Sequence, residues 1–168
     1  MERLETRRQL SLFIPEPWGS VVDSVRAQAD PVQHALIPAH ATLVRDEDVD
    51  DWSVVRVRLN LLGPIRMELS VGEVQGCDYD GAYLPLEGPT HEYDRLRQVL
   101  LFDQPGCSRT QAPHITLMHP RNRANFGMQF ANLKAVKFPP AVTFDQVVMI
   151  AQSRGRPWKV VASSPHYS

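Results

Sequence analysis

The 168-residue sequence predicts an α+β protein built from two similar lobes that face each other across a pseudo-twofold axis. Two observations lead to this expectation: segments with strand and helix periodicity follow one another along the chain, and the chain repeats itself internally. The chain has the length of one large domain, so we expect a single domain over residues 1–168. The approximate repeat relates residues 10–44 to residues 84–118.

The first part of the chain reads as strand, helix and strand. An apolar run over 10–14 stops at two prolines, helical spacing follows over 18–29, and a second strand spans 37–44. The segment 46–62 fits a helix and a strand equally well and ends at Gly63-Pro64 in either case.

The rest of the chain continues the alternation. Apolar and polar residues alternate strictly over 65–71, which indicates a half-buried strand, and 81–86 is the next strand expected. Thr90 is a helix N-cap candidate, with Glu92 and Asp94 in the favourable first turn. A strand over 114–117, a short helix around 126–133 and closing strands over 143–151 and 158–162 complete the prediction.

The internal repeat appears without gaps when the chain is shifted by 74 residues. Leu10 then lies on Leu84, and the segment with His40, Thr42 and Leu43 lies on the segment with His114, Thr116 and Leu117. Each copy is a strand, a turn marked by proline, a helix and a strand. Two copies cannot form a solenoid, so two lobes joined near residues 76–80 are the better interpretation.

Composition excludes several classes of protein. The formal net charge is −1 and no block of Lys or Arg stands out, which argues against binding long nucleic acid but leaves a small nucleotide possible. No apolar run approaches the ~20 residues of a membrane helix, and no secretory signal follows the N-terminal arginines. Cys77 and Cys107 are too few for a disulfide framework, so we expect unpaired cysteines and a cytoplasmic location.

The two His-x-Thr-Leu segments carry the candidate chemistry. In a strand, residues i and i+2 project from the same face, so His40 and Thr42 point together, as do His114 and Thr116. If the lobes face each other, one cleft contains two imidazoles with a hydroxyl beside each. Histidine is suited to accept and to donate a proton because its ordinary pKa is near 6.5, and hydroxyls can hold phosphate oxygens without a metal ion.

At these residues the chain resembles the 2H phosphoesterase superfamily, which includes 2′-5′ RNA ligase-like proteins and cyclic nucleotide phosphodiesterases. The resemblance implies a bilobal fold of two antiparallel β-sheets with flanking helices and a central cleft. It implies metal-independent hydrolysis of 2′,3′-cyclic or related cyclic nucleotide phosphodiesters, or of 2′-5′ linkages. His40 and His114 are then the catalytic pair, and Thr42 and Thr116 bind the substrate phosphate.

Other residues near the motifs are candidates for substrate contacts. Arg45, Arg121 and Arg123 follow the motif strands and could reach a phosphate, although solvated loop arginines are equally compatible with the pattern. Phe13 and Trp18 could stack on a base or pack in the core. His119 lies at an odd offset from His114, so in a continuing strand it points elsewhere. No carboxylate or cysteine at suitable spacing completes a zinc site with other histidines, so no metal and no cofactor are expected.

Two other functions stay compatible with the sequence. One is a nucleotide- or RNA-end-binding module with little catalysis, and the other is reversible 2′-5′ RNA ligation, with a ribose hydroxyl in place of water. The expected partner in each case is a small nucleotide or an RNA-terminal cyclic phosphate. No groove for long nucleic acid and no membrane are implied, and we expect a monomer.

Overall fold

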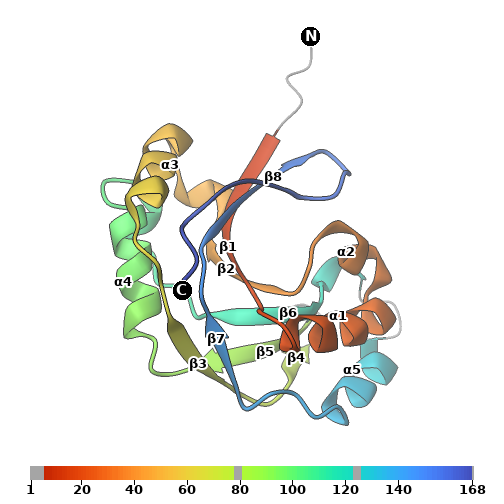
Figure 1. Cartoon of the computed structure of the whole chain (residues 1–168). Helices are drawn as coiled ribbons and strands as arrows, with labels where there is room; N and C mark the ends of the chain where they lie inside the picture. The colour runs from red at the N-terminus through yellow and green to blue at the C-terminus, as the bar shows by residue number, and fades with distance from the viewer. Residues whose placement is uncertain (1–5, 78–80, 123–125, 168) are drawn as a thin grey trace.

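The computed structural model describes residues 6–77, 81–122 and 126–167, and it confirms the α+β class. Figure 1 shows strands curving through the middle of the molecule with helices on either side. The elements, in chain order, are β1 (Thr6–Phe13), α1 (Trp18–Ala29), α2 (Pro31–Leu36), β2 (His40–Val44), η1 (Asp46–Asp48), α3 (Trp52–Leu61), β3 (Met67–Val71), β4 (Gln75–Cys77), β5 (Gly81–Glu87), α4 (His91–Leu100), η2 (Pro105–Ser108), β6 (His114–Met118), η3 (Pro120–Asn122), α5 (Phe126–Lys134), β7 (Ala141–Phe144), β8 (Val148–Ser153) and β9 (Lys159–Ser163).

The strands join into one antiparallel path in the order β7-β3-β5-β6-β2-β1-β8-β9, with β4 paired to β5. The expected two sheets are therefore continuous, because β2 and β6 are paired side by side at the centre of the path. We call β2, β1, β8 and β9 the first half-sheet and β6, β5, β3 and β7 the second. Each half-sheet places the outer strand of a repeat copy, β1 or β5, beside its motif strand, β2 or β6. The pseudo-twofold axis itself stays a prediction.

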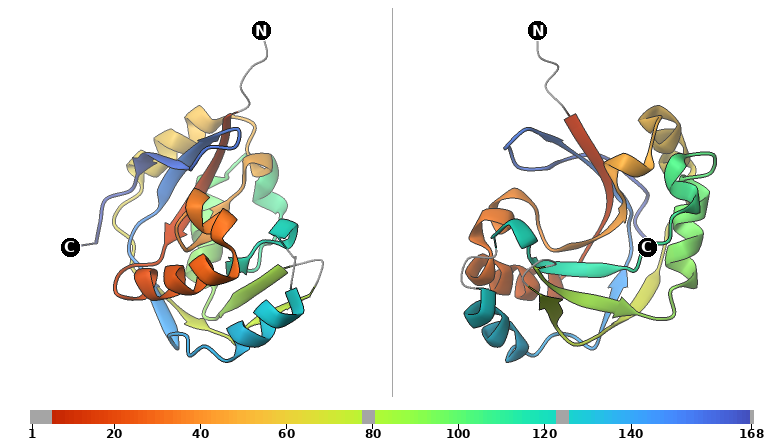
Figure 2. Two further views of the ribbon diagram at one scale, coloured as in Figure 1. Left: turned by 90° about the vertical axis from the view of Figure 1, so that its right-hand side faces the viewer. Right: turned by 180° about the vertical axis from the view of Figure 1, so that it is seen from behind.

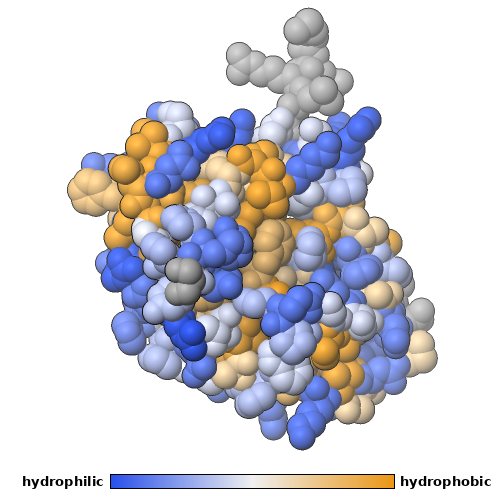
Figure 3. Space-filling model, viewed as in Figure 1, coloured by the Kyte–Doolittle hydropathy of each residue, from blue (hydrophilic) through white to orange (hydrophobic). Residues whose placement is uncertain are grey.

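The ambiguous segment 46–62 is helical. Asp51 caps α3 by accepting a hydrogen bond from the backbone N–H of Ser53 at 2.9 Å. Val55 and Leu59, one helical turn apart, are fully buried, so helical spacing determines the face that packs. Val57 and Leu61 remain exposed, and an apolar area lies over α3 at the upper left of Figure 3.

Two further segments differ from the prediction. The expected closing strand over 143–151 is two strands, β7 and β8, which end up at different places: β7 pairs with β3, whereas β8 pairs with β1. Residues 31–36, for which no element was expected, form α2, with Pro31 at its start and Asp30 accepting from the N–H of Gln33 at 3.0 Å.

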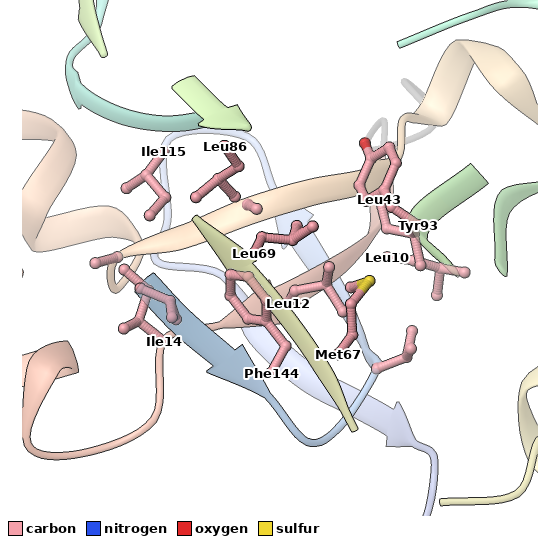
Figure 4. Packing of buried hydrophobic residues seen from close by; sticks show 14 of the residues in the cluster. Leu10, Leu12, Ile14, Leu43, Met67, Leu69, Leu86, Tyr93, Ile115 and Phe144 are labelled. Carbon is pink, nitrogen blue, oxygen red and sulfur yellow. The ribbon is translucent and has the colours of Figure 1, made fainter. Parts of the chain in front are cut away.

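Helices flank the sheet in two groups, α1, α2 and α5 on one side and α3 and α4 on the other (Figure 2). The core lies behind the motif strands, where Ala41, Leu43 and Ile115 are 0% exposed and Leu117 is 1% exposed. Figure 4 shows Leu43 and Ile115 among side chains from both half-sheets. The two motif strands therefore rest on one shared core. No helix in the described part of the chain has the length and apolar character needed to cross a membrane.

Candidate active site

The two motif strands bring the predicted catalytic residues together. Ala41 of β2 lies opposite Ile115 of β6 in an antiparallel pair. This register places His40 across from Thr116 and Thr42 across from His114. Because the alternate residues are buried in the core, all four polar side chains project from the other face of the central strand pair.

Both histidine rings are held in the same way. His40 Nδ1 lies 2.8 Å from the carbonyl oxygen of Pro38, and His114 Nδ1 lies 3.0 Å from the carbonyl oxygen of Ala112. A carbonyl only accepts hydrogen bonds, so each Nδ1 carries a proton and donates it. In each neutral ring Nε2 is then the nitrogen free to take up a proton.

One cavity of about 400 Å³ contains all four motif side chains, and we call it the histidine cleft. Its lining is strongly cationic, since five arginines face two carboxylates: Arg7, Arg8, Arg26, Arg45 and Arg121 against Asp46 and Glu47. Such a lining attracts anions and favours phosphate in particular, because guanidinium groups can donate two parallel hydrogen bonds to it.

The environment of His40 favours the neutral imidazole. Burial in the cleft wall is the main cause that lowers its pKa from 6.5 to about 4, and the positive charges of Arg26 and His114 act in the same direction. The Pro38 carbonyl and Asp23 oppose this shift more weakly than burial drives it. At neutral pH the His40 imidazole is therefore uncharged and can accept a proton.

A buried ion pair supports the His40 side of the cleft. Arg26 is 2% exposed, and its Nη1 donates to Asp23 Oδ1 at 2.7 Å and to the Ile37 carbonyl at 2.9 Å. The same Asp23 oxygen accepts from the N–H of Ala39 at 2.9 Å. Helix α1 thus clamps the segment that leads into His40.

Thr42 is positioned through its backbone and its hydroxyl. Its carbonyl accepts hydrogen bonds from Tyr93 Oη at 2.7 Å and from Gln111 Nε2 at 2.8 Å. Its Oγ1 accepts from Gln9 Nε2 at 3.1 Å. Because the hydroxyl oxygen already accepts, its own hydrogen can be donated to a ligand in the cleft.

The other residues predicted to contact the substrate lie at different places in the structure. Arg45 and Arg121 line the histidine cleft, and Arg123 lies outside the described residues. Phe13 packs its ring edge against His40, with centroids 6.2 Å apart, but it lines a cavity elsewhere. Trp18, the first residue of α1, is 38% exposed and is absent from the cleft lining.

Several cleft residues were missed by sequence reasoning. The expectation that His119 points elsewhere is wrong, because β6 ends at Met118 and Asp30 Oδ2 accepts from the N–H of His119 at 2.8 Å, so the chain turns into the cleft. Trp158 also lines the cleft, with the Arg7 guanidinium 5.9 Å from its ring centroid. No sequence signal links Arg7 with Trp158, because only the pairing of β1 with β8 and of β8 with β9 brings these two residues together.

No cluster of three or more His, Cys, Asp or Glu side chains suited to a metal ion occurs within residues 6–77, 81–122 and 126–167. Cys107 is a free, exposed thiol. The side chain of Cys77 lies outside the described structure.

The fold is similar to that of solved structures of Escherichia coli LigT and of a protein described as a phosphoesterase. Escherichia coli LigT complexed with NADP⁺ has 17% sequence identity and a TM-score of 0.64, and the match covers 99% of this chain and 100% of that one. LigT in its apo form has 19% identity and a TM-score of 0.60, covering 94% and 95%. A protein described as a phosphoesterase has 17% identity and a TM-score of 0.55, covering 95% and 97%. No family model and no curated protein sequence matches the chain.

Proposed function

We propose that this protein is a 2H-type phosphodiesterase that acts on a small or RNA-terminal nucleotide phosphodiester, with His40 as general base and His114 as general acid. One observation carries the proposal: two structurally equivalent histidine–threonine pairs project from adjacent strands into one arginine-lined cleft. A binding protein has no need of two titratable rings that present the same nitrogen to one ligand.

The reaction uses this chain's own groups. Nε2 of His40 takes a proton from water as the water oxygen bonds to phosphorus. His114 enters this step as the imidazolium, with a proton on Nε2 as well as on Nδ1. Its Nε2 gives that proton to the departing ribose oxygen as the phosphorus–oxygen bond breaks, and the ring becomes neutral. The hydroxyls of Thr42 and Thr116 donate to the non-bridging oxygens, where negative charge accumulates.

The surroundings of His40 support this assignment of roles. His40 is neutral at working pH because burial and the Arg26 charge lower its pKa to about 4, so it can serve as the base from the start of the cycle. His114, across the strand pair, is then the proton donor. Reversal of the same steps, with a ribose hydroxyl replacing water, would join two ends.

The ligands of the neighbouring fold support a nucleotide substrate. LigT has been crystallised with phosphate, with 3′-AMP, with ATP and with NADP⁺. Each of these LigT ligands is phosphate or carries a phosphate group. A cleft lined by five arginines favours a ligand of the same kind in this protein. We therefore place 2′,3′-cyclic nucleotides and 2′-5′-linked nucleotides first among the candidate substrates.

The test is a substrate panel assayed in EDTA with wild type, His40→Ala, His114→Ala and the double variant. Each single variant should lose about 10²–10⁴ in rate, the usual contribution of a general acid or base. The double variant should lose far less than the product of the singles, because the pair acts as one unit.

The matched control is Cys107→Ser, which changes an exposed thiol outside the cleft and should turn over at the wild-type rate. Near-normal turnover by His114→Ala on every substrate would reject paired acid–base catalysis. Loss of wild-type activity in EDTA, with recovery on adding a divalent ion, would reject the metal-independent mechanism.

A further inference from the structure

A second cavity of about 600 Å³ adjoins the histidine cleft. Arg45, Glu47 and His114 line both cavities, so the His114 ring stands at their common border. His40 lines the histidine cleft and is absent from the lining of the second cavity. The two cavities therefore differ in their contact with the catalytic pair. The proton donor His114 lines both cavities, whereas the base His40 lines only the histidine cleft.

The second cavity is nearly balanced in charge. Asp48, 3% exposed, lies between two of its arginines, with Oδ2 3.5 Å from Arg97 Nη1 and Oδ1 3.3 Å from Arg109 Nη1. Arg45, the third arginine, has Glu47 3.8 Å away. The lining of the second cavity has three arginines and two carboxylates, whereas that of the histidine cleft has five arginines and two carboxylates, so the second cavity attracts a phosphate less.

Uncharged groups supply the remaining recognition chemistry. Tyr83 lines the cavity and sets its ring edge-on to His114, with centroids 5.5 Å apart, while its hydroxyl donates to Gln75 Oε1 at 3.4 Å. The hydroxyl of Thr110 also lines the cavity, whereas the amide of Gln111, another lining residue, already bonds to the Thr42 carbonyl and to Arg97. An aromatic surface beside a hydroxyl group is suited to a heterocyclic base and a ribose.

We propose that the second cavity is a nucleoside subsite and that it receives the leaving group. The inference rests on the proposed function and names its substrate class: a phosphodiester with a nucleoside on each side of the scissile phosphate. Each cavity lies within the roughly 300–1,000 Å³ typical of small-molecule sites. A cyclic mononucleotide has one nucleoside and would leave one of the two cavities to water.

The position of His114 determines the direction of cleavage. Water adds to phosphorus and loses a proton to His40. The phosphorus–oxygen bond to the nucleoside in the second cavity breaks, and that oxygen takes the proton of His114. The products are a free nucleoside from the second cavity and a nucleotide whose phosphate remains among the cleft arginines.

The experiment narrows the second cavity with Thr110→Trp, at an exposed loop position on its wall. The control is Ser108→Trp, two residues away, exposed and outside both cavities. Substrates are diadenosine monophosphate, with 2′-5′ and 3′-5′ linkages in separate arms, and adenosine 2′,3′-cyclic phosphate. The measured quantity is kcat/KM for the preferred dinucleoside divided by kcat/KM for the cyclic mononucleotide. We expect Thr110→Trp to lower this ratio at least tenfold and Ser108→Trp to keep the wild-type ratio.

An unchanged ratio in Thr110→Trp, or an equal change in both tryptophan variants, would overturn the subsite while leaving the proposed phosphodiesterase intact. If wild type turns over none of the substrates, calorimetric affinities for the dinucleosides and for AMP give the same ratio. A dinucleoside affinity that Thr110→Trp fails to weaken relative to AMP would then reject the subsite. The activity of the histidine variants tests the catalytic pair and does not test the subsite.

Discussion

Replacing His40 by Asn should remove part of the acid sensitivity of the folded protein. The pKa of His40 is about 4 when folded and 6.5 in the unfolded chain. Between these values the unfolded chain binds a proton that the folded protein does not bind. Lowering the pH through this interval therefore favours unfolding, and the loss of stability is complete below the folded pKa.

The magnitude follows from the size of the interval. Each pH unit inside it costs about 1.4 kcal/mol, so His40 should lower the free energy of unfolding by about 2–3 kcal/mol between pH 7.5 and pH 4.5. Asparagine cannot titrate there. Urea unfolding of wild type and His40→Asn at several pH values measures the difference, in which the carboxylates common to both proteins cancel.

The matched control is His91→Asn, at an exposed position at the start of α4 outside both cavities. It should follow the wild-type pH dependence. If wild type and His40→Asn lose stability in parallel from pH 7.5 to pH 4.5, His40 is not held neutral in the folded state, and its assignment as the base loses its physical support.

Three further outcomes are expected. The acidic limb of the pH profile of kcat/KM should lie well below 6.5, because the folded pKa of His40 is about 4; a limb at 6.5 or above would contradict this. Thr42→Ala and Thr116→Ala should each lower kcat by about 10–10³, as expected for one lost donor to the developing charge, and variants as inactive as the histidine variants would point to another role. Urea unfolding should change by no more than about 1.5 kcal/mol, the usual contribution of one hydrogen bond, because Thr42 also accepts from Gln9. Leu43→Ala should destabilise the fold by about 2–5 kcal/mol, because this side chain is 0% exposed beneath the motif strands, and a loss below 1 kcal/mol in urea unfolding would contradict that packing.

The sequence contains most of the information that defines the paired histidines. The shift of 74 residues aligns His40 with His114, and strand periodicity puts each histidine on the face of its threonine. Local signals also suffice for α3, where Asp51 supplies the cap. These features are a repeat, a periodicity and a local cap of the chain itself, so a single sequence records them.

Features that depend on which strands become neighbours were not predictable. Only Asp145 and Gln146 separate the apolar residues of β7 from those before β8, and an apolar pattern says nothing of which partner strand each segment joins. Trp158 and Arg26 reach the histidine cleft through such tertiary placement. The second cavity likewise exists only where η1, β5 and the loop before β6 converge.

The pairing of β1 with β8 affects the order in which the protein can be completed during synthesis. A ribosome delivers β1 before β8, the strand that covers its outer edge, and strands β2 to β7 are synthesised between them. Until then β1 has an uncovered edge, which is a template for pairing with other chains. The first half-sheet to be synthesised is therefore finished late, and chaperone binding or slow assembly would be concentrated at this edge.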